Sequence, residues 1–223
     1  LVTKENHCER NFVTDRRRSS QQGGKVFSFH QKVFQKVFLF HIDHRDKYEG
    51  GKRMNIQKFT QKSVEAINDC EKLAYEYGNQ EIEQEHLLVA LLRQEDGLIP
   101  KLIEKMEIQK EHFVDNAERH LAARVKVSGG QVYVGQDLNK VLVHAEDEAK
   151  AMGDEYVSVE HLFLCLIKYP NKAMKEIFKE YGITRERFLQ ALSTVRGNQR
   201  VVSDNPEATY DTLEKYGYDM VER

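Results

Sequence analysis

The sequence predicts an all-α fold in which two pseudo-twofold, four-helix repeats pack into one domain. The first observation is the low count of three prolines in 223 residues, which favours long helices. The second is that Glu85-His86-Leu87 recurs as Glu160-His161-Leu162, which indicates an internal repeat whose length is the step from position 86 to position 161. The third is that apolar residues recur at helical spacing in both copies.

The repeat extends well beyond this short motif. The same constant offset, that of His161 from His86, aligns the two copies without a gap. The matched positions carry identical or similar residues and include Glu71 with Glu146, Ala74 with Ala149, Gly78 with Gly153, Asn79 with Asp154, Leu91 with Leu166, Ile108 with Ile183, and Phe113 with Phe188. We therefore expect the two halves to share one backbone arrangement.

The first helix of each copy has a start signal and a stop signal. Thr60 can cap the first helix, whose expected apolar stripe contains the four residues Val64, Ile67, Ala74 and Tyr77. Gly78 supplies a left-handed stop. The counterpart is expected over 137–152, with Gly153 as its stop.

Three shorter helices follow in each copy. Ser158 can cap the second helix of the second copy, which carries Leu162, Phe163, Leu166 and Ile167. Third helices are expected near 98–106 and 173–181. Fourth helices should begin after Ile108 and Ile183, the latter with Thr184 as its cap.

These signals divide residues 54–223 into two parts. Residues 54–197 form the domain, with repeats over 54–126 and 133–197, and residues 198–223 form a linker and a helix start. Lys126 to Gln136, which contains Gly129 and Gly130, is expected to be a mobile connector between the copies. Because four short helices bury little apolar surface alone, the copies should pack together.

Residues 1–53 differ in character from the rest. They show no sustained period and carry a net charge of +6, whereas residues 54–223 carry −8. Codons for Glu49-Gly50-Gly51 can spell a bacterial ribosome-binding sequence just before Met54, so our hypothesis is a disordered, non-native upstream extension. The alternative is a basic arm that binds nucleic acid or membrane.

Composition excludes several classes of function. The acidic repeat region argues against a nucleic-acid surface, and the apolar stretch near 33–42 is too short and polar to span a membrane. Cys8, Cys70 and Cys165 lack the spacing of a metal site or a disulfide framework, which fits a reducing compartment. Cys70 and Cys165 lie on apolar stripes, where we expect small buried side chains.

The paired Glu-His-Leu motifs, the repeat and the start at 54–60 resemble the Clp N-terminal domain family, found on ClpA, ClpB and ClpC. The tail is similar to the segment that joins the ClpB N-domain to its first ATPase module, in the stretches 198–201, 205–210 and 213–217. The resemblance covers 54–223 and implies a ClpB-type chaperone. No phosphate loop of the Gly-Lys-Ser/Thr kind occurs in the sequence.

The resemblance implies a non-enzymatic domain that binds unfolded or aggregated polypeptides for an ATP-dependent, cytoplasmic protein disaggregase. This fragment should need no cofactor and be a monomer. The full-length protein would use ATP and Mg, form a homohexamer and work with a DnaK-type chaperone. The alternatives are the adaptor-binding domain of a protease-coupled ClpC or ClpA unfoldase and, much less favoured, a hydrolase using Glu160 and His161.

The resemblance also implies a peptide-binding site at Thr60, Asp154 and Glu160, to which we add Glu85 as the equivalent of Glu160. A purely structural role is open for each, since Thr60 can cap a helix and both glutamates fall in first helical turns. His86 and His161 should be packing residues, because neither lies at metal-ligand spacing. We expect no catalytic residue and no metal site.

One departure from the family bears on the ligand. Some ClpC N-domains use Gly-Thr-Glu-His in both repeats to hold phosphorylated arginine, whereas this chain has Glu83-Gln84-Glu85-His86. Glu83 would repel a phosphate, so that activity is not expected. We expect instead an apolar cleft between or beside the repeats that takes exposed hydrophobic segments.

Overall fold

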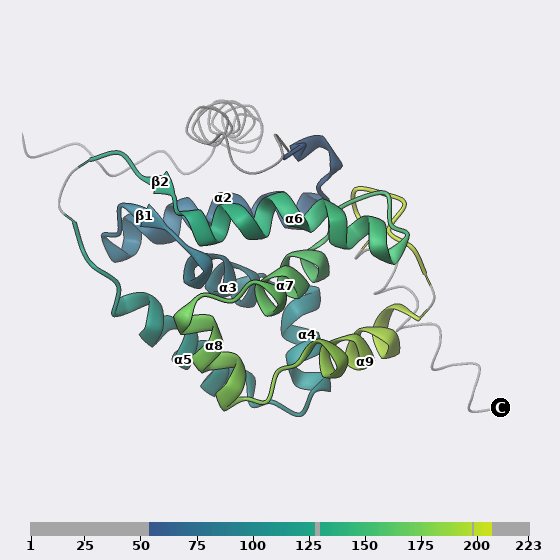
Figure 1. The fold of residues 1–223 in the computed structure, drawn as a ribbon. Coiled ribbons are helices and arrows are strands. Elements are labelled where there is room, and N and C mark those ends of the chain that lie inside the picture. The colour runs from purple at the N-terminus through teal and green to yellow at the C-terminus, as the bar shows by residue number, and fades with distance from the viewer. Residues whose placement is uncertain (1–53, 128–129, 198, 207–223) are drawn as a thin grey trace, which may run out of the picture. The chain divides into compact units, whose positions relative to one another are not determined.

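The computed structural model describes residues 54–127, 130–197 and 199–206. The first repeat contains the 3-10 turn η1 (Ile56–Lys58) and helices α2 (Gln61–Tyr77), α3 (Gln84–Arg93), α4 (Leu98–Lys105) and α5 (Lys110–Ala122). The second contains α6 (Gln136–Met152), α7 (Val159–Lys168), α8 (Lys172–Glu180) and α9 (Arg185–Arg196). Corresponding helices keep the predicted offset at both ends to within one residue, so the predicted all-α double repeat is confirmed (Figure 1).

The helix ends follow the predicted signals. Thr60 is the N-cap of α2, and its side chain accepts a hydrogen bond from the amide of Ser63. Gly78 and Gly153 end α2 and α6 in the left-handed region, with φ of 71° and 75°. Ser158 and Thr184 cap α7 and α9 as expected.

The buried face of α2 is displaced from the predicted stripe. Ile67 and Ala74 are buried as expected, but Val64 and Tyr77 are only half-buried. The buried face of α2 also includes four residues that were not in the predicted stripe: Ser63, Ala66, Cys70 and Leu73. The prediction for Val64 and Tyr77 was therefore wrong, because the face of α2 that the packed domain buries is centred on Ala66, Cys70 and Leu73.

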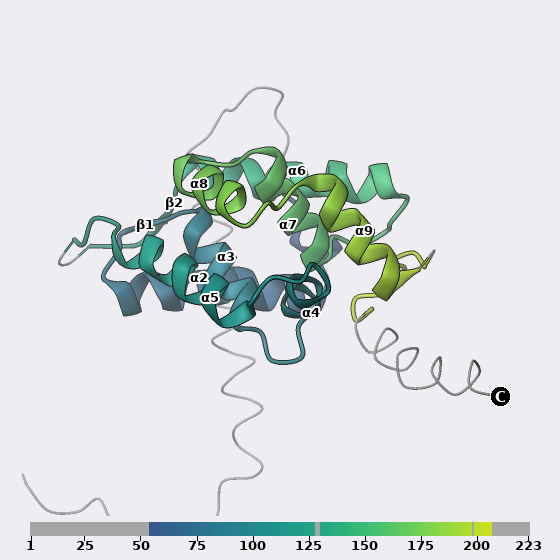
Figure 2. The same ribbon diagram turned by 90° about the horizontal axis from the view of Figure 1, so that it is seen from below.

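Helices α3 and α7 lie at the centre of the domain in both views (Figure 1 and Figure 2). α2 packs on α3 and α6 packs on α7, while α3 also contacts α8 and α7 also contacts α4. The last pair of contacts crosses between the repeats in both directions. The two copies therefore share one core, which includes the fully buried rings of Phe113, Phe163 and Phe188.

Short extended segments of the two repeats also pair with each other. β1 (Glu81–Ile82) pairs in parallel with β2 (Tyr133–Val134), which precedes α6. At the equivalent place, Phe59, which precedes α2, forms a parallel bridge with Val157. The pairing is reciprocal, because the repeat offset converts Ile82 into Val157 and Phe59 into Val134.

This pairing corrects our prediction for the connector. Residues 133–135 are held to repeat 1 by hydrogen bonds from the amides of Tyr133 and Gly135 to the carbonyls of Gln80 and Ile82, at 2.9 and 2.8 Å. The connector is therefore ordered by strand pairing over this part, and only residues 128–129 of it lie outside the described residues. The predictions for 1–53 and for 207–223 also lie outside them.

Both thiols within the described residues are buried, as predicted. Cys70 and Cys165 are each 1 % exposed. Burial raises the pKa of both thiols, that of Cys165 to about 12, so both stay protonated and unreactive near neutral pH. No helix in the described part of the chain is long and apolar enough to cross a bilayer.

Candidate functional site

The candidate site is built on the turn between α6 and α7. Ser158, the N-cap of α7, donates its backbone N–H to Nδ1 of His161 at 2.9 Å, which closes a capping box with histidine in the place usually held by Glu or Gln. Because Nδ1 accepts this bond, Nε2 carries the ring proton and donates to Oδ2 of Asp154 at 2.9 Å. The predicted packing role of His161 thus includes orienting a carboxylate.

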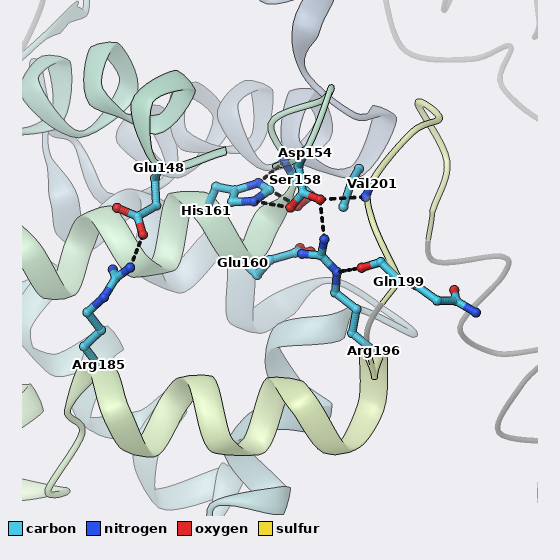
Figure 3. Close-up of polar contacts among 9 residues, drawn as sticks. All are labelled: Glu148, Asp154, Ser158, Glu160, His161, Arg185, Arg196, Gln199 and Val201. Carbon is cyan, nitrogen blue, oxygen red and sulfur yellow. Dashed lines mark hydrogen bonds and ion pairs between the residues drawn. The ribbon is translucent and has the colours of Figure 1, made fainter. Parts of the chain in front are cut away.

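Asp154 is the centre of a buried ionic cluster (Figure 3). Its Oδ1 accepts hydrogen bonds from Nη2 of Arg196 and from the amide of Val201, the latter at 2.9 Å. Burial by itself raises the pKa of Asp154, but the bonds from His161, Arg196 and Val201 outweigh it and lower this pKa to about 2. The group is therefore a carboxylate throughout the physiological range.

Glu160 shares the guanidinium of Arg196 but is less well satisfied. Its Oε1 lies 3.4 Å from Nη1 of Arg196, and its side chain has no exposed surface. Its Oε2 is buried and has no hydrogen-bond partner among the described residues. A buried carboxylate oxygen is costly unless it accepts a hydrogen bond, so Oε2 of Glu160 can take one further donor.

Thr60 reaches the same turn through the backbone. Its N–H donates to the carbonyl of Val157 at 2.9 Å, while its hydroxyl caps α2 and bonds to Oγ of Ser63 at 3.0 Å. The side chain is fully buried. The structure thus gathers Thr60, Asp154 and Glu160 around one turn, although none of the three presents its side chain to solvent.

A segment after α9 covers this turn. We call residues 199–206 the strap. The carbonyl of Val201 accepts from the amides of Glu155 and Tyr156 at 2.9 and 3.3 Å, and the carbonyl of Asp204 accepts from the amide of Gln61 at 2.8 Å. The side chain of Val201 is completely buried. The strap therefore ties α9 to the start of α2 across the candidate site.

Glu85 lies at the equivalent place in repeat 1, with different partners. Its Oε1 accepts from Arg124 at 3.0 Å and its Oε2 from Nδ2 of Asn171, the N-cap of α8, at 3.1 Å. Both carboxylate oxygens are thus satisfied inside the domain, one of them across the repeat boundary. The structure does not place Glu85 in the Asp154 cluster, and its contacts suit a tie between repeats.

Glu83, close to Glu85 in the sequence, connects the two repeats through its carboxylate. Glu83 caps its own helix α3 and also accepts from the amide of Leu138, in the first turn of α6, at 3.2 Å. Its Oε1 lies 1.8 Å from the point where a Cβ would stand on Gly135, so any side chain at this position would displace the carboxylate. Burial, with Asp137 and Glu81 nearby, raises the pKa of Glu83 to about 7.

Sequence reasoning missed Arg196 altogether. The only signal was the repeat alignment, in which Arg196 falls opposite Leu121, just as Asp154 falls opposite Asn79. Two charged residues of opposite sign therefore replace an apolar and a neutral residue in the same copy. Such paired changes between equivalent positions indicate a contact, and the structure contains it.

A groove of about 680 Å³ lies where α5 approaches the ends of α2 and α8. It is lined by Tyr77, Tyr181 and Ala122 and by the titratable residues His112, Asp115, Glu118, Arg119 and Glu180. The apolar cleft expected between or beside the repeats stays a prediction. The described residues contain no group of three or more His, Cys, Asp or Glu side chains arranged to hold a metal ion.

The chain is similar in sequence to one protein family. The family model for the "Clp repeat (R) N-terminal domain" matches residues 58–210. The chaperone protein ClpB of Nitratidesulfovibrio vulgaris is 47% identical over 175 residues, which are 76% of this chain and 20% of that protein. ClpB of Clostridium tetani is 40% identical over 174 residues, again 76% of this chain and 20% of the relative. The chain thus spans about a fifth of these relatives' length.

Solved structures share the fold. The Hsp104 N-terminal domain from Candida albicans superimposes with a TM-score of 0.60 and 23% sequence identity, over 67% of this chain and 99% of that one. A ClpV N-domain in complex with a VipB peptide gives a TM-score of 0.52 and 19% identity, over 67% of this chain and 94% of that one. At these identities the likeness concerns the backbone arrangement.

Proposed function

The chain belongs to the Clp repeat N-terminal domain family, and from that premise we propose that it is the domain of a ClpB-type protein disaggregase that binds unfolded or aggregated polypeptides. The observation that carries this proposal is the 47% identity to a ClpB chaperone over 76% of this chain. We call a polypeptide bound in this way a client. The contribution of this domain is binding rather than chemistry.

The peptide-binding part of the proposal has separate support. A ClpV N-domain of the same fold has been solved with a VipB peptide, so the double repeat can present a peptide site. In this chain the turn 154–158 and the first turn of α7 combine a hydrogen-bond acceptor, the buried Oε2 of Glu160, with a covering segment, the strap. We therefore place the client site at this turn, with Thr60, Asp154 and Glu160 forming its floor.

Glu85 has a supporting part in this proposal. Its bonds to Arg124 and Asn171 fix the relative positions of α3, α5 and α8. We propose that it contributes to client binding by holding the second repeat in register, and that Asp154 and Glu160 bear the direct contacts. A carboxylate there would favour clients whose apolar segments are flanked by basic residues.

The remainder of the proposal concerns the longer protein. In it, ATPase modules that use ATP and Mg would form a homohexamer in the cytoplasm and act with a DnaK-type chaperone. Residues 54–197 would be a mobile client-binding domain, and 198–223 its tether to the first module. A weak site on a flexible tether raises the local concentration of client near the hexamer.

An NMR titration tests the client site. Reduced, carboxymethylated α-lactalbumin is a soluble unfolded probe, and the disulfide-intact, folded form of the same protein is its matched control. We expect the unfolded form to shift the amide resonances of Thr60 and of 154–161, and the folded form to leave them unchanged. Neutralising Glu160 with Glu160→Gln should weaken binding severalfold, while Glu95→Gln, at an exposed position elsewhere, should not.

Two results would contradict the proposal in different ways. Resonance shifts confined to other surfaces, such as the groove at Tyr77 and Tyr181, would move the site and leave the function in place. The absence of any shift at millimolar probe, with the domain folded, would remove client binding as the function of this domain.

A further inference from the structure

The strap occupies, within the same molecule, the place that the preceding proposal gives to the client. We propose that the pocket filled by Val201 is a binding site for one aliphatic residue of an extended client segment, and that the strap fills it when no client is bound. The inference rests on the proposed function and adds to it the class of ligand and the competitor. Figure 3 shows Val201 and Gln199 passing beside Asp154 and Arg196.

The strap binds through contacts that any extended polypeptide can reproduce. The Val201 residue offers a carbonyl to the amides of Glu155 and Tyr156 and an N–H to Oδ1 of Asp154, which are main-chain bonds independent of side-chain identity. A second carbonyl, that of Asp204, meets the amide of Gln61 at the first turn of α2. The site therefore reads an extended backbone, as in recognition by strand addition.

The pocket supplies the selective element. Val201 is fully buried, whereas its neighbour Val202 is 60 % exposed. A site that buries one β-branched side chain between main-chain bonds selects aliphatic residues and rejects charged ones, because a charge there would lose its hydration without a partner. The class of ligand is thus an extended segment with Val, Ile or Leu at one position.

Comparison with repeat 1 argues against a purely structural need for this burial. There the connector contributes only backbone atoms to two hydrogen bonds with the equivalent turn: Val127 donates its N–H to the carbonyl of Gly78, and the carbonyl of Val125 accepts from Nδ2 of Asn79. Lys126, the equivalent of Val201, is exposed. The same turn is therefore stable without a buried side chain from the covering segment.

Occupation of the site by the strap reduces the apparent affinity for clients. When the binding-competent state is a fraction of the population, the apparent dissociation constant rises by the inverse of that fraction. A tethered competitor also has a high effective concentration. Client binding would accordingly release the strap from α2 and lengthen the tether.

The test compares the variant Val201→Ser with Val202→Ser, which makes the same chemical change at the exposed neighbour. Fluorescence anisotropy of labelled, reduced and carboxymethylated α-lactalbumin measures client affinity in the full chain, and circular dichroism checks that both variants are folded. We expect Val201→Ser to bind the probe roughly tenfold more tightly than the wild type, and Val202→Ser to match the wild type. Unchanged or weaker binding by folded Val201→Ser overturns the inference.

A measurement on the wild-type chain keeps the inference testable if Val201→Ser does not fold. Hydrogen exchange is followed by NMR with and without saturating probe. The amide of Val201 donates to Asp154, and release of the strap breaks this bond even when the backbone of the client takes its place. The amide of Val201 should therefore exchange at least tenfold faster in the presence of client, while the amide of Gly135, which donates to Ile82, should not change. Client binding that leaves the amide of Val201 protected overturns the inference but not the proposed function. Failure of the probe to bind either the wild type or Val201→Ser overturns both.

Discussion

The two turns that follow the first helix of each repeat have the same backbone and different chemistry. In repeat 1, Nε2 of His86 faces the neutral Oδ1 of Asn79 at 3.2 Å. In repeat 2, Nε2 of His161 faces the carboxylate of Asp154, which Arg196 also binds. The capping box is common to both, so the ionic cluster is an addition to the scaffold and not a condition for forming it.

The two junctions between repeats differ in a complementary way. At one, Thr60 supplies the cap of α2 and the facing N-cap residue, Ser158, is short. At the other, Gly135 has no side chain and the facing residue, Glu83, reaches across to cap α6. In the first junction the larger residue, Thr60, precedes the long helix, whereas in the second the larger residue, Glu83, faces it from the other repeat. The same space can thus be filled from either repeat.

The largest effect should come from removing the cation of the ionic cluster. Arg196→Leu installs the residue found at the equivalent position 121 and leaves two carboxylates, Asp154 and Glu160, buried without a counter-charge. We expect a loss of about 3–5 kcal/mol in the free energy of unfolding, measured by urea denaturation.

A second substitution distinguishes this cause from loss of packing. Adding Asp154→Asn to Arg196→Leu reproduces the neutral pair of repeat 1 and should restore a large part of the lost stability, because one stranded charge is removed. If the double variant is no more stable than Arg196→Leu alone, the stranded charge is not the cause.

An intermediate effect is expected at the Glu83 junction. Gly135→Ala places a methyl group where Oε1 of Glu83 lies, so the carboxylate must swing away and lose its bond to the amide of Leu138. We expect a loss of about 2 kcal/mol by urea denaturation. In a background of Glu83→Ser, which copies Ser158, the same alanine should cost little. An equal cost in both backgrounds would mean that the backbone of Gly135, and not Glu83, sets the requirement.

The smallest effect is a pH dependence at the same junction. The folded-state pKa of Glu83 is about 7, above its usual value near 4.5, so Glu83 favours the folded state more as the pH falls from 7 toward 4.5. His86 acts in the opposite sense. Burial and nearby Arg124 lower its pKa to about 4, so its contribution is lost as the pH falls from 6.5 toward 4.

The contribution of Glu83 is isolated by difference. Between pH 7.5 and pH 5, the stability of wild type relative to Glu83→Gln should increase by roughly 1–2 kcal/mol, as measured by urea denaturation at each pH. If the stability difference between wild type and Glu83→Gln does not change with pH, the pKa of Glu83 is not raised in the folded protein.

Most of the fold could be predicted from the sequence because its signals are local. Thr60, Gly78, Ser158 and Gly153 mark helix ends whichever way the helices pack, and the predicted ends are correct. The two-residue strands could not be predicted, because Ile82 and Val134 pair only after the repeats meet. The burial of Ser63, Ala66 and Cys70 on α2 could not be predicted for the same reason, since it depends on how α2 packs on α3.

The candidate site was predictable only in part. The resemblance identified Asp154 and Glu160, but their burial depends on Arg196, which is distant from both in the sequence and contacts the two carboxylates only in the folded protein. The resemblance predicted a linker over the strap, and the exposed residues between Val201 and Pro206 give no sequence signal that Val201 is buried. A pair of adjacent valines followed by polar residues carries no periodicity from which burial could be inferred.

The reciprocal pairing of Phe59 with Val157 and of Ile82 with Val134 has a consequence for how such a chain can arise. One copy alone holds only half of each pair, so a single repeat can complete its edges only by exchanging leading segments with a second molecule. A symmetric homodimer of a half-length protein would already contain every contact of this kind, and joining two such genes would convert it into the tandem chain without a new interface.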